Sequence, residues 1–149
     1  YITGAAGRID PEKAEAMAEE AEALGSKEAF CRLGEALLMK KDSPDYGEKA
    51  FQCFKRAARH RVPFAYARLG LCYEAGIGTA ADIRKSVKYY RKSAESGDPF
   101  GMAHLGYALA NGEGVRKNEK EAMEWLIRAA MHGDSGAIKV LKEDYNYTL

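Results

Sequence analysis

A fixed spacing of 36 residues organises this chain. Leu33, Leu69, Leu105 and Leu141 lie 36 residues apart, and their neighbours recur with them in the segments AFCRLGEAL, AYARLGLCY, GMAHLGYAL and AIKVLKEDY. A period of this length is typical of a solenoid, in which each unit buries its apolar face only by stacking on its neighbours. The repeat therefore predicts the fold and indicates that function resides in the surface of the stack.

Each unit has the sequence pattern of two helices. In the second half of the third unit, the apolar or small residues occupy positions 122, 123, 126, 129 and 130, which form one face of an α-helix. Equivalent stripes surround Phe51 and Tyr90 in the earlier units. No segment shows the alternation of apolar and polar residues that is typical of a strand. We therefore predict an all-α fold, an α/α solenoid of antiparallel helix pairs with about eight helices.

Glycine followed by a capping residue marks the boundary between units at Gly25-Ser26, Gly97-Asp98 and Gly133-Asp134. Glycine accepts the left-handed conformation past the last helical turn, and the Ser or Asp oxygen can accept hydrogen bonds from the free amides of the next helix. Pro63 and Pro99 fit the first turn of a helix, where the missing N–H has no cost. These signals predict that a new helix begins after each boundary.

The second and third units share a longer pattern, roughly A-x-x-x-L-G-x-x-Y-x-x-G-x-G-V followed by D-x-x-K-A-x-x-W-Y-x-K-A-A-x-x-G. They match it at Ala65, Leu69, Gly70, Tyr73, Gly76, Gly78, Lys85, Tyr90, Lys92, Ala94, Gly97, Leu105, Gly106, Gly112, Gly114, Val115, Ala122, Trp125, Ala129, Ala130 and Gly133. The pattern resembles that of the Sel-one-like repeat (SLR) family, a relative of the tetratricopeptide repeats, over nearly the whole chain. The resemblance implies a right-handed superhelix whose first helices line a concave side on which partner proteins bind.

The repeats predict a single domain with a terminal cap. We expect a partial repeat at 1–28, repeats at 29–64, 65–100 and 101–136, and a capping helix at 137–149.

Three departures from the pattern qualify this division. Tyr1 and Gly4 occupy the positions of Tyr73 and Gly76, so the chain begins inside a unit and we expect it to be a fragment of a longer protein. The segment 40–44 replaces the G-x-G turn of the later units. Lys142 replaces a glycine that recurs at the same place in the other units, as suits a last helix with no partner after it.

Composition excludes several broad classes. The formal net charge is +1 with 30% charged residues, so no global field attracts nucleic acid or membrane. No apolar run approaches the roughly 20 residues of a spanning helix. Cys31, Cys53 and Cys72 cannot all pair with one another, and we interpret them as buried thiols. Unpaired cysteines and the lack of a visible signal peptide favour a cytoplasmic setting.

Catalytic motifs are not evident. His60, His104 and His132 fall at different repeat positions with no second ligand at metal spacing, and His104 takes the polar helix position of Arg32 and Arg68. No G-x-S-x-G elbow occurs, and Gly76-Ile77-Gly78 recurs with the repeat, so it is a turn and not a phosphate loop. We predict no enzymatic activity, no cofactor and no metal.

The first helices offer a candidate binding surface. Their exposed positions predict a partner-binding concave face at Glu35, Leu38, Phe64, Leu71, Glu74, Phe100, Tyr107 and Asn111. The two Phe, the Leu and the Tyr form an apolar strip with the small residues Ala67 and Ala103 between them, which suits a peptide or helix. The alternative is that Phe64 and Phe100 only staple the start of their helices.

The second helices carry a basic stripe, which we define as Arg84, Lys85, Lys88, Arg91 and Lys92. Such a stripe suits an acidic partner, anionic lipid or nucleic acid. The alternative is a solvated outer face, because aromatic residues that could stack on bases do not interleave with these cations.

These observations predict a non-catalytic scaffold or adaptor that binds a partner protein or peptide on its concave face. The alternatives are binding of an acidic partner, lipid or nucleic acid through the basic stripe, or a purely structural spacer. Nucleic acid is the less expected partner.

Overall fold

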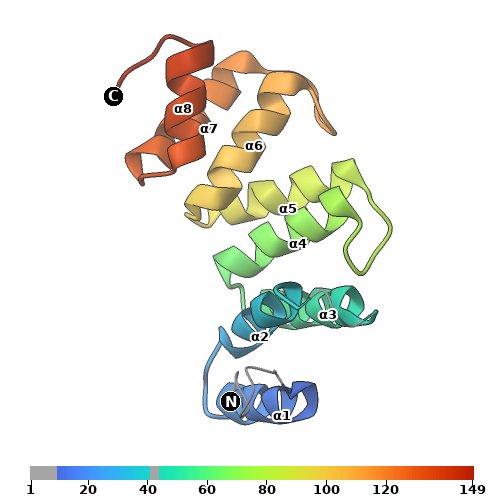
Figure 1. Cartoon of the computed structure of the whole chain (residues 1–149). Helices are drawn as coiled ribbons and strands as arrows, with labels where there is room; N and C mark the ends of the chain where they lie inside the picture. The colour runs from blue at the N-terminus through green and yellow to red at the C-terminus, as the bar shows by residue number, and fades with distance from the viewer. Residues whose placement is uncertain (1–9, 41–43) are drawn as a thin grey trace.

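The computed structural model describes residues 10–40 and 44–149, and these ranges contain eight α-helices and no strand. The helices are α1 (Pro11–Ala23), α2 (Ala29–Leu38), α3 (Tyr46–Arg59), α4 (Pro63–Ala75), α5 (Ile83–Glu95), α6 (Pro99–Asn111), α7 (Glu119–Met131) and α8 (Ser135–Asp144). They stack in one elongated column with α1 at one end and α8 at the other (Figure 1). The predicted all-α solenoid is confirmed. Tyr1, Gly4 and positions 41–43 lie outside the described residues.

Acidic or amide side chains cap most of the helices. The carboxylates of Asp98 and Asp134 accept hydrogen bonds from the backbone N–H groups of Gly101 and Ala137. These two predicted caps are confirmed, and Pro63 and Pro99 begin α4 and α6. The expectation for Ser26 is wrong, because Glu28 stands at the N-cap of α2 and makes no side-chain cap hydrogen bond. The turn before α2 is two residues longer than the later turns between units, so Ser26 lies too far from the helix.

The turns between units require a left-handed backbone. Gly25, Gly97 and Gly133 have φ values of 99°, 94° and 86°. The equivalent residue between α3 and α4 is Arg61, which adopts φ 57° although it carries a side chain. A residue with a Cβ is disfavoured there by about 1–2 kcal/mol. This turn is therefore strained in a way that the glycine-based signals did not reveal.

Glycine within each first helix allows the second helix to pack closely. A Cβ on Gly34 would lie 2.7 Å from the ring of Phe54, and a Cβ on Gly106 would lie 2.7 Å from Leu126 Cγ. Contacts this short are not tolerated between carbon atoms without rearrangement. A Cβ on Gly70 would clash with the ring of Tyr90 in the same way. The glycine that recurs after each repeat leucine thus sets the distance within a helix pair.

The repeat leucines Leu33, Leu69, Leu105 and Leu141 are all buried in the core between helices. The most extensive contacts join the helices of one pair: α2 with α3, α4 with α5, and α6 with α7. Across pairs, the first helices α4 and α6 also contact each other directly, and no two second helices contact each other to that extent. The contact between α4 and α6 is consistent with the expectation that the first helices line the concave side, which stays a prediction. We call their surface the inner face.

Candidate functional site

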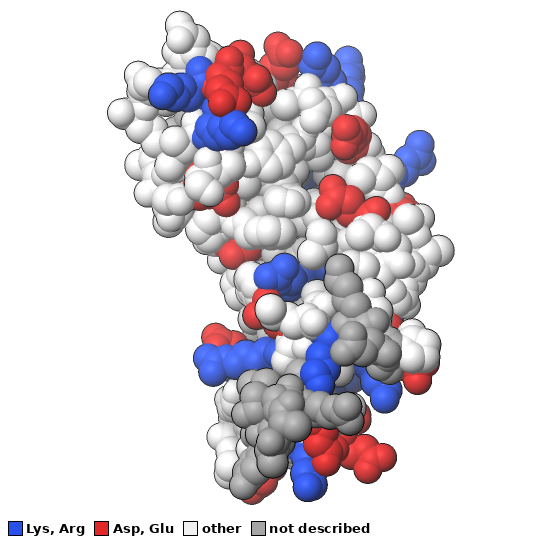
Figure 2. All heavy atoms as spheres, in the orientation of Figure 1, with Lys and Arg blue, Asp and Glu red and all other residues white. Residues whose placement is uncertain are grey.

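The inner face is nearly uncharged over α6. The sequence of this helix, PFGMAHLGYALAN, contains no Asp, Glu, Lys or Arg. Figure 2 shows the corresponding part of the surface as a mostly uncharged area, with charged side chains gathered above and below it. A surface of this kind offers apolar contacts rather than long-range attraction to a partner.

Two phenylalanines enclose an arginine on the inner face. Phe64 and Phe100 are each the second residue of their helices, and both are half-buried. The Arg68 guanidinium carbon lies 4.5 Å from the Phe64 ring centroid and 5.4 Å from that of Phe100. Each contact is a cation–π interaction. The rings therefore bridge two repeats through Arg68, which is more than a local staple at the start of each helix.

Arg68 also connects to the preceding repeat. Its Nη2 donates to Glu35 Oε1 at 2.7 Å, across from α4 to α2. Its Nε is buried and has no acceptor among the described residues. Glu35, a predicted site residue, is thus held by an ion pair within the protein. Glu74, another predicted site residue, is exposed and accepts a hydrogen bond from the hydroxyl of Tyr90 at 2.9 Å.

A row of rings continues along α6. The imidazole of His104 stacks on Phe100 with centroids 4.1 Å apart and lies 5.6 Å from the ring of Tyr107. On its other side the ring of Tyr90 lies 4.9 Å away. Burial among these rings lowers the pKa of His104, so the imidazole is neutral at physiological pH. The sequence placed His104 at a polar helix position and missed its membership of this row. Its spacing from Phe100 and Tyr107, four and three residues along one helix, was the available signal.

The remaining predicted residues of the inner face differ in exposure. Leu38, Leu71 and Tyr107 are half-buried, and Asn111 is exposed at the end of α6. The expectation that small residues lie open between the aromatic side chains is wrong. Ala67 is 0% and Ala103 is 1% exposed, because both face the packed interior between helices. The inner face is a row of rings over these alanines and not a strip with gaps between them.

A hollow of about 380 Å³ lies beside Phe64, where the first turns of α2, α4 and α6 approach one another. Its walls come from α2, from the start of α4 and from the turn between α5 and α6: Glu28, Cys31, Arg32, Glu35, Val62, Pro63, Phe64, Ser96, Gly97, Asp98 and Pro99. Arg32 spans part of its edge with a long contact of 3.5 Å to Glu28, both side chains being exposed. The hollow is large enough for one side chain of a partner.

The basic stripe divides into paired and unpaired cations. Arg91 is half-buried and donates to Glu121 Oε1 at 2.7 Å. Arg84, Lys85, Lys88 and Lys92 are exposed. None of these four forms an ion pair with a residue in the described ranges, so most of the stripe is available to solvent or to a partner.

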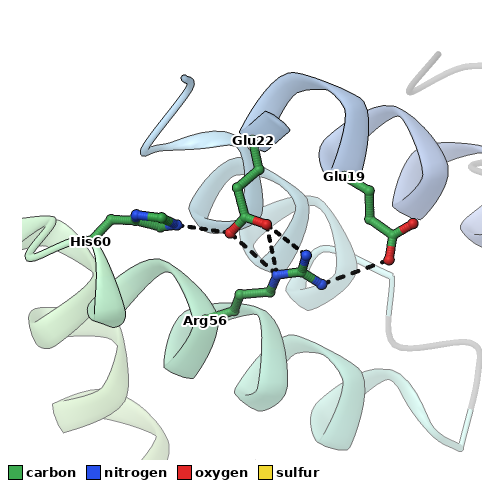
Figure 3. Close-up of polar contacts among 4 residues, drawn as sticks. All are labelled: Glu19, Glu22, Arg56 and His60. Carbon is green, nitrogen blue, oxygen red and sulfur yellow. Dashed lines mark hydrogen bonds and ion pairs between the residues drawn. The ribbon is translucent and has the colours of Figure 1, made fainter. Parts of the chain in front are cut away.

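A second ion-pair network joins α1 to α3 (Figure 3). The Arg56 Nε and Nη2 donate to both oxygens of Glu22, with a shortest distance of 2.6 Å, and Arg56 Nη1 lies 3.7 Å from Glu19. His60 Nε2 lies 2.8 Å from the same Glu22 carboxylate. The hydrogen bond from Arg56, followed by that from His60, lowers the pKa of Glu22. The acidic first helix thereby neutralises Arg56, the basic residue of α3 that is equivalent to Lys92.

The three cysteines are free and buried, as expected. Burial raises the pKa of Cys31 to about 12 and those of Cys53 and Cys72 to about 11. Across residues 10–40 and 44–149, no cluster of three His, Cys, Asp or Glu side chains is arranged to hold a metal ion. No helix in the same ranges has the length and apolarity needed to cross a bilayer.

Comparisons with known proteins agree with this geometry. The sequence profile described as the Sel1 repeat, the unit of the Sel-one-like proteins, matches residues 31–61, 63–98 and 99–134. No curated protein has a significantly similar sequence.

Three solved structures share the fold. A Sel1 repeat protein from Oxalobacter formigenes is 30% identical, with a TM-score of 0.74 over 93% of this chain and 62% of that one. A protective antigen of uropathogenic Escherichia coli with an SLR fold is 31% identical, with a TM-score of 0.81 over 98% of this chain and 31% of that one. Cysteine-rich protein B of Helicobacter pylori is 27% identical, with a TM-score of 0.70 over 95% of this chain and all 100% of that one. The chain thus spans less than two thirds of the length of the first two.

Proposed function

The chain belongs to the Sel1 repeat family, whose fold is generally a scaffold for protein–protein interaction, and we propose that it holds a partner protein or peptide on its inner face. Such proteins are generally not catalytic, and in our proposal this chain carries out no chemistry of its own. It presents a fixed surface, made by the first helices, to a segment of another protein.

The observation that carries the proposal is the row of rings formed by Phe64, Phe100, His104 and Tyr107. These side chains come from two repeats and are half-buried. Phe100 stacks on His104 with centroids 4.1 Å apart, His104 lies beside Tyr107, and Arg68 links Phe64 to Phe100. Aromatic side chains that are already fixed lose little conformational entropy when a partner binds. Half-buried aromatic residues also dominate the binding free energy in many protein interfaces.

The hollow beside Phe64 provides a place for one anchoring side chain of the partner. It lies at one end of the row of rings, and its volume of about 380 Å³ exceeds that of any single amino-acid side chain. In our proposal the partner segment follows the row from Tyr107 toward Phe64 and inserts a side chain there. Glu35 and Asp98 on the walls of the hollow would give polar contacts to that side chain.

Affinity capture from a lysate of the source cells tests this proposal. The bait is the folded chain, compared with a Phe100→Glu, Tyr107→Glu double variant. The matched control is an Ile83→Glu, Met131→Glu variant, which introduces the same charges at exposed apolar residues of the second helices. Circular dichroism first establishes that all three baits are equally helical. A protein captured by the wild type and the control but lost by the Phe100→Glu, Tyr107→Glu variant supports the inner face. Equal capture by all three baits would contradict it.

A further inference from the structure

Positive charge accumulates on two neighbouring second helices. In α5, with the sequence IRKSVKYYRKSAE, five residues are basic and one is acidic. In α3, with the sequence YGEKAFQCFKRAAR, four are basic and one is acidic. The helices on either side supply carboxylates only at the borders, through Glu22 to Arg56 and Glu121 to Arg91. The part of this surface between α3 and α5 receives no ion-pairing carboxylate from them.

The border between α5 and α7 shows how the repeat balances charge. Arg91 and Glu121 form an ion pair of 2.7 Å with each side chain about one third exposed (34% and 31%). The indole N–H of Trp125 also donates to Glu121, at 3.4 Å. Hydrogen bonds from Arg91 and Trp125 lower the pKa of Glu121, which therefore remains charged at neutral pH.

One repeat earlier, the same two positions carry like charges. Subtracting the period of 36 from Arg91 and Glu121 gives Lys55 and Lys85. By the repeat, Lys85 takes the position relative to Lys55 that Glu121 takes relative to Arg91. Neither lysine forms an ion pair with any residue at 10–40 or 44–149. The carboxylate of Asp82 caps the backbone N–H of Lys85 and makes no ion pair with its ammonium group. The α3–α5 border thus lacks the anion that its neighbour contains.

Aromatic rings hold both lysines in place. The Lys55 Nζ lies 5.5 Å from the Phe51 ring centroid, and the Lys85 Nζ lies 5.5 Å from that of Tyr73. Phe51 and Tyr73 are themselves in edge-to-face contact, with centroids 5.6 Å apart. The two ammonium groups therefore rest on one continuous aromatic cluster. Cation–π attraction to these rings helps to hold each ammonium group in a defined position.

We propose that Lys55 and Lys85 form a docking site for a carboxylate on an acidic segment of a protein partner. That carboxylate would occupy the place that Glu121 takes at the next border. The exposed cations Arg84, Lys88 and Lys92 extend the site along α5 for further acidic residues of the same segment. The site lies on the second helices, so it goes beyond the proposed use of the inner face and gives the scaffold a second partner.

The ring geometry favours an acidic protein segment over nucleic acid. Tyr73 and Tyr89 stack nearly parallel, with an interplanar angle of 8° and centroids 5.5 Å apart. Lys92 lies 5.4 Å from the centroid of Tyr89. Proteins that bind single-stranded nucleic acid need ring faces free to stack on bases. Here those faces are occupied by another ring or by an ammonium group, whereas the cations remain exposed.

Fluorescence anisotropy with defined probes tests the site. The probes are a short fluorescein-labelled peptide of alternating Glu and Ser, and a labelled oligothymidylate of the same charge. Each is titrated with the chain at about 50 mM and about 200 mM salt. We expect the peptide to bind at the lower salt, to bind more weakly at the higher salt, and to bind more tightly than the oligothymidylate. No peptide binding at the lower salt, or tighter binding of the oligothymidylate, would overturn the proposal.

The decisive variant is Lys85→Glu, which gives Lys55 an internal carboxylate partner. We expect peptide affinity to fall at least about threefold while the thermal midpoint stays the same or rises, because an ion pair replaces a repulsion. The Lys139→Glu variant on α8 makes the same charge change at an exposed lysine elsewhere and should retain binding. A Lys55→Gln variant, which reverses no charge, should also weaken binding. Equal losses in Lys85→Glu and Lys139→Glu, or no loss in either, would refute the site.

Discussion

The ring of Tyr90 on α5 packs directly against Gly70 on α4, so that a Cβ on Gly70 would lie 2.6 Å from both Cδ1 and Cε1 of Tyr90. Tyr90 is 2% exposed and its hydroxyl is tied to Glu74, so the ring has little freedom to move away. The spacing of the two helices in this pair therefore depends on the absence of a side chain at one position.

The Gly70→Ala variant should be destabilised, because the added methyl group forces the two helices apart. We expect a loss of about 1–3 kcal/mol in the free energy of unfolding, as for other overpacked sites. Urea unfolding followed by circular dichroism measures it. The Lys142→Ala variant, at the equivalent position of α8 where the side chain is exposed, should change stability by less than about 0.5 kcal/mol. Equal stability of Gly70→Ala and the wild type would contradict this packing.

The Arg61→Gly variant should be more stable than the wild type. Arg61 has φ 57° at a turn where the other units place glycine. Relief of the left-handed strain is offset in part by the greater entropy of glycine in the unfolded chain, which leaves a gain of about 1 kcal/mol. The thermal midpoint of an Arg61→Ala variant is the control, because alanine keeps the strain and should give no gain. A gain of the same size in both variants would show that strain is not the cause.

The contact between α1 and α3 should weaken in acid. The pKa of Glu22 lies below its ordinary value of 4.5 in the folded protein, chiefly because Arg56 and His60 donate hydrogen bonds to it. A carboxyl group of this kind stabilises the fold above its unfolded pKa, and this stabilisation is lost as the pH falls through the folded pKa. The stability difference between the wild type and Glu22→Gln should therefore be largest near pH 7 and shrink below about pH 4. A difference that is constant with pH would contradict the network in Figure 3.

The three thiols should react only when the protein unfolds. Each is buried, and burial raises the pKa values of Cys31, Cys53 and Cys72 to between about 11 and about 12. The thiolate is the reactive form, so almost none is present near pH 8. Ellman's reagent should detect no thiol within minutes in the native protein and all three in guanidinium chloride. Rapid reaction of even one native thiol would show that its surroundings open readily.

The fold could be predicted from the sequence because the 36-residue period repeats the physical requirements of one unit. Leu105 and Gly106 recur together because a buried leucine and a close helix approach are needed in every pair. Exceptions to the pattern were harder to foresee. The period places Arg61 at the position that glycine takes in the other units, but an arginine gives no sign by its type that it adopts the left-handed conformation there. Ser26 matched a cap by type, but the longer turn removes it from the helix.

The candidate site was predicted less completely than the fold. Phe64, Phe100 and Tyr107 were chosen from the sequence because of their repeat positions on the first helices, and their role in binding stays a prediction. The roles of Arg68 and His104 were missed, because their enclosure by rings depends on side chains from adjacent repeats. Ala67 and Ala103 were expected on the surface but are buried. Repeat positions alone do not show which residues at the edge of a helix face are covered by the neighbouring helix. The like charges of Lys55 and Lys85 could have been found from the sequence, because the 36-residue period aligns them with Arg91 and Glu121.

The most direct test of the account is the dissociation constant of the captured partner, measured by titration calorimetry for the wild type and for Tyr107→Ala. Tyr107 is half-buried at the end of the row of rings, and its removal takes away an anchor without emptying the core. We predict a loss of about 1–3 kcal/mol in binding, which is a dissociation constant about fivefold to 150-fold larger, with an unchanged thermal midpoint. An unchanged dissociation constant in the folded variant would contradict binding on the inner face.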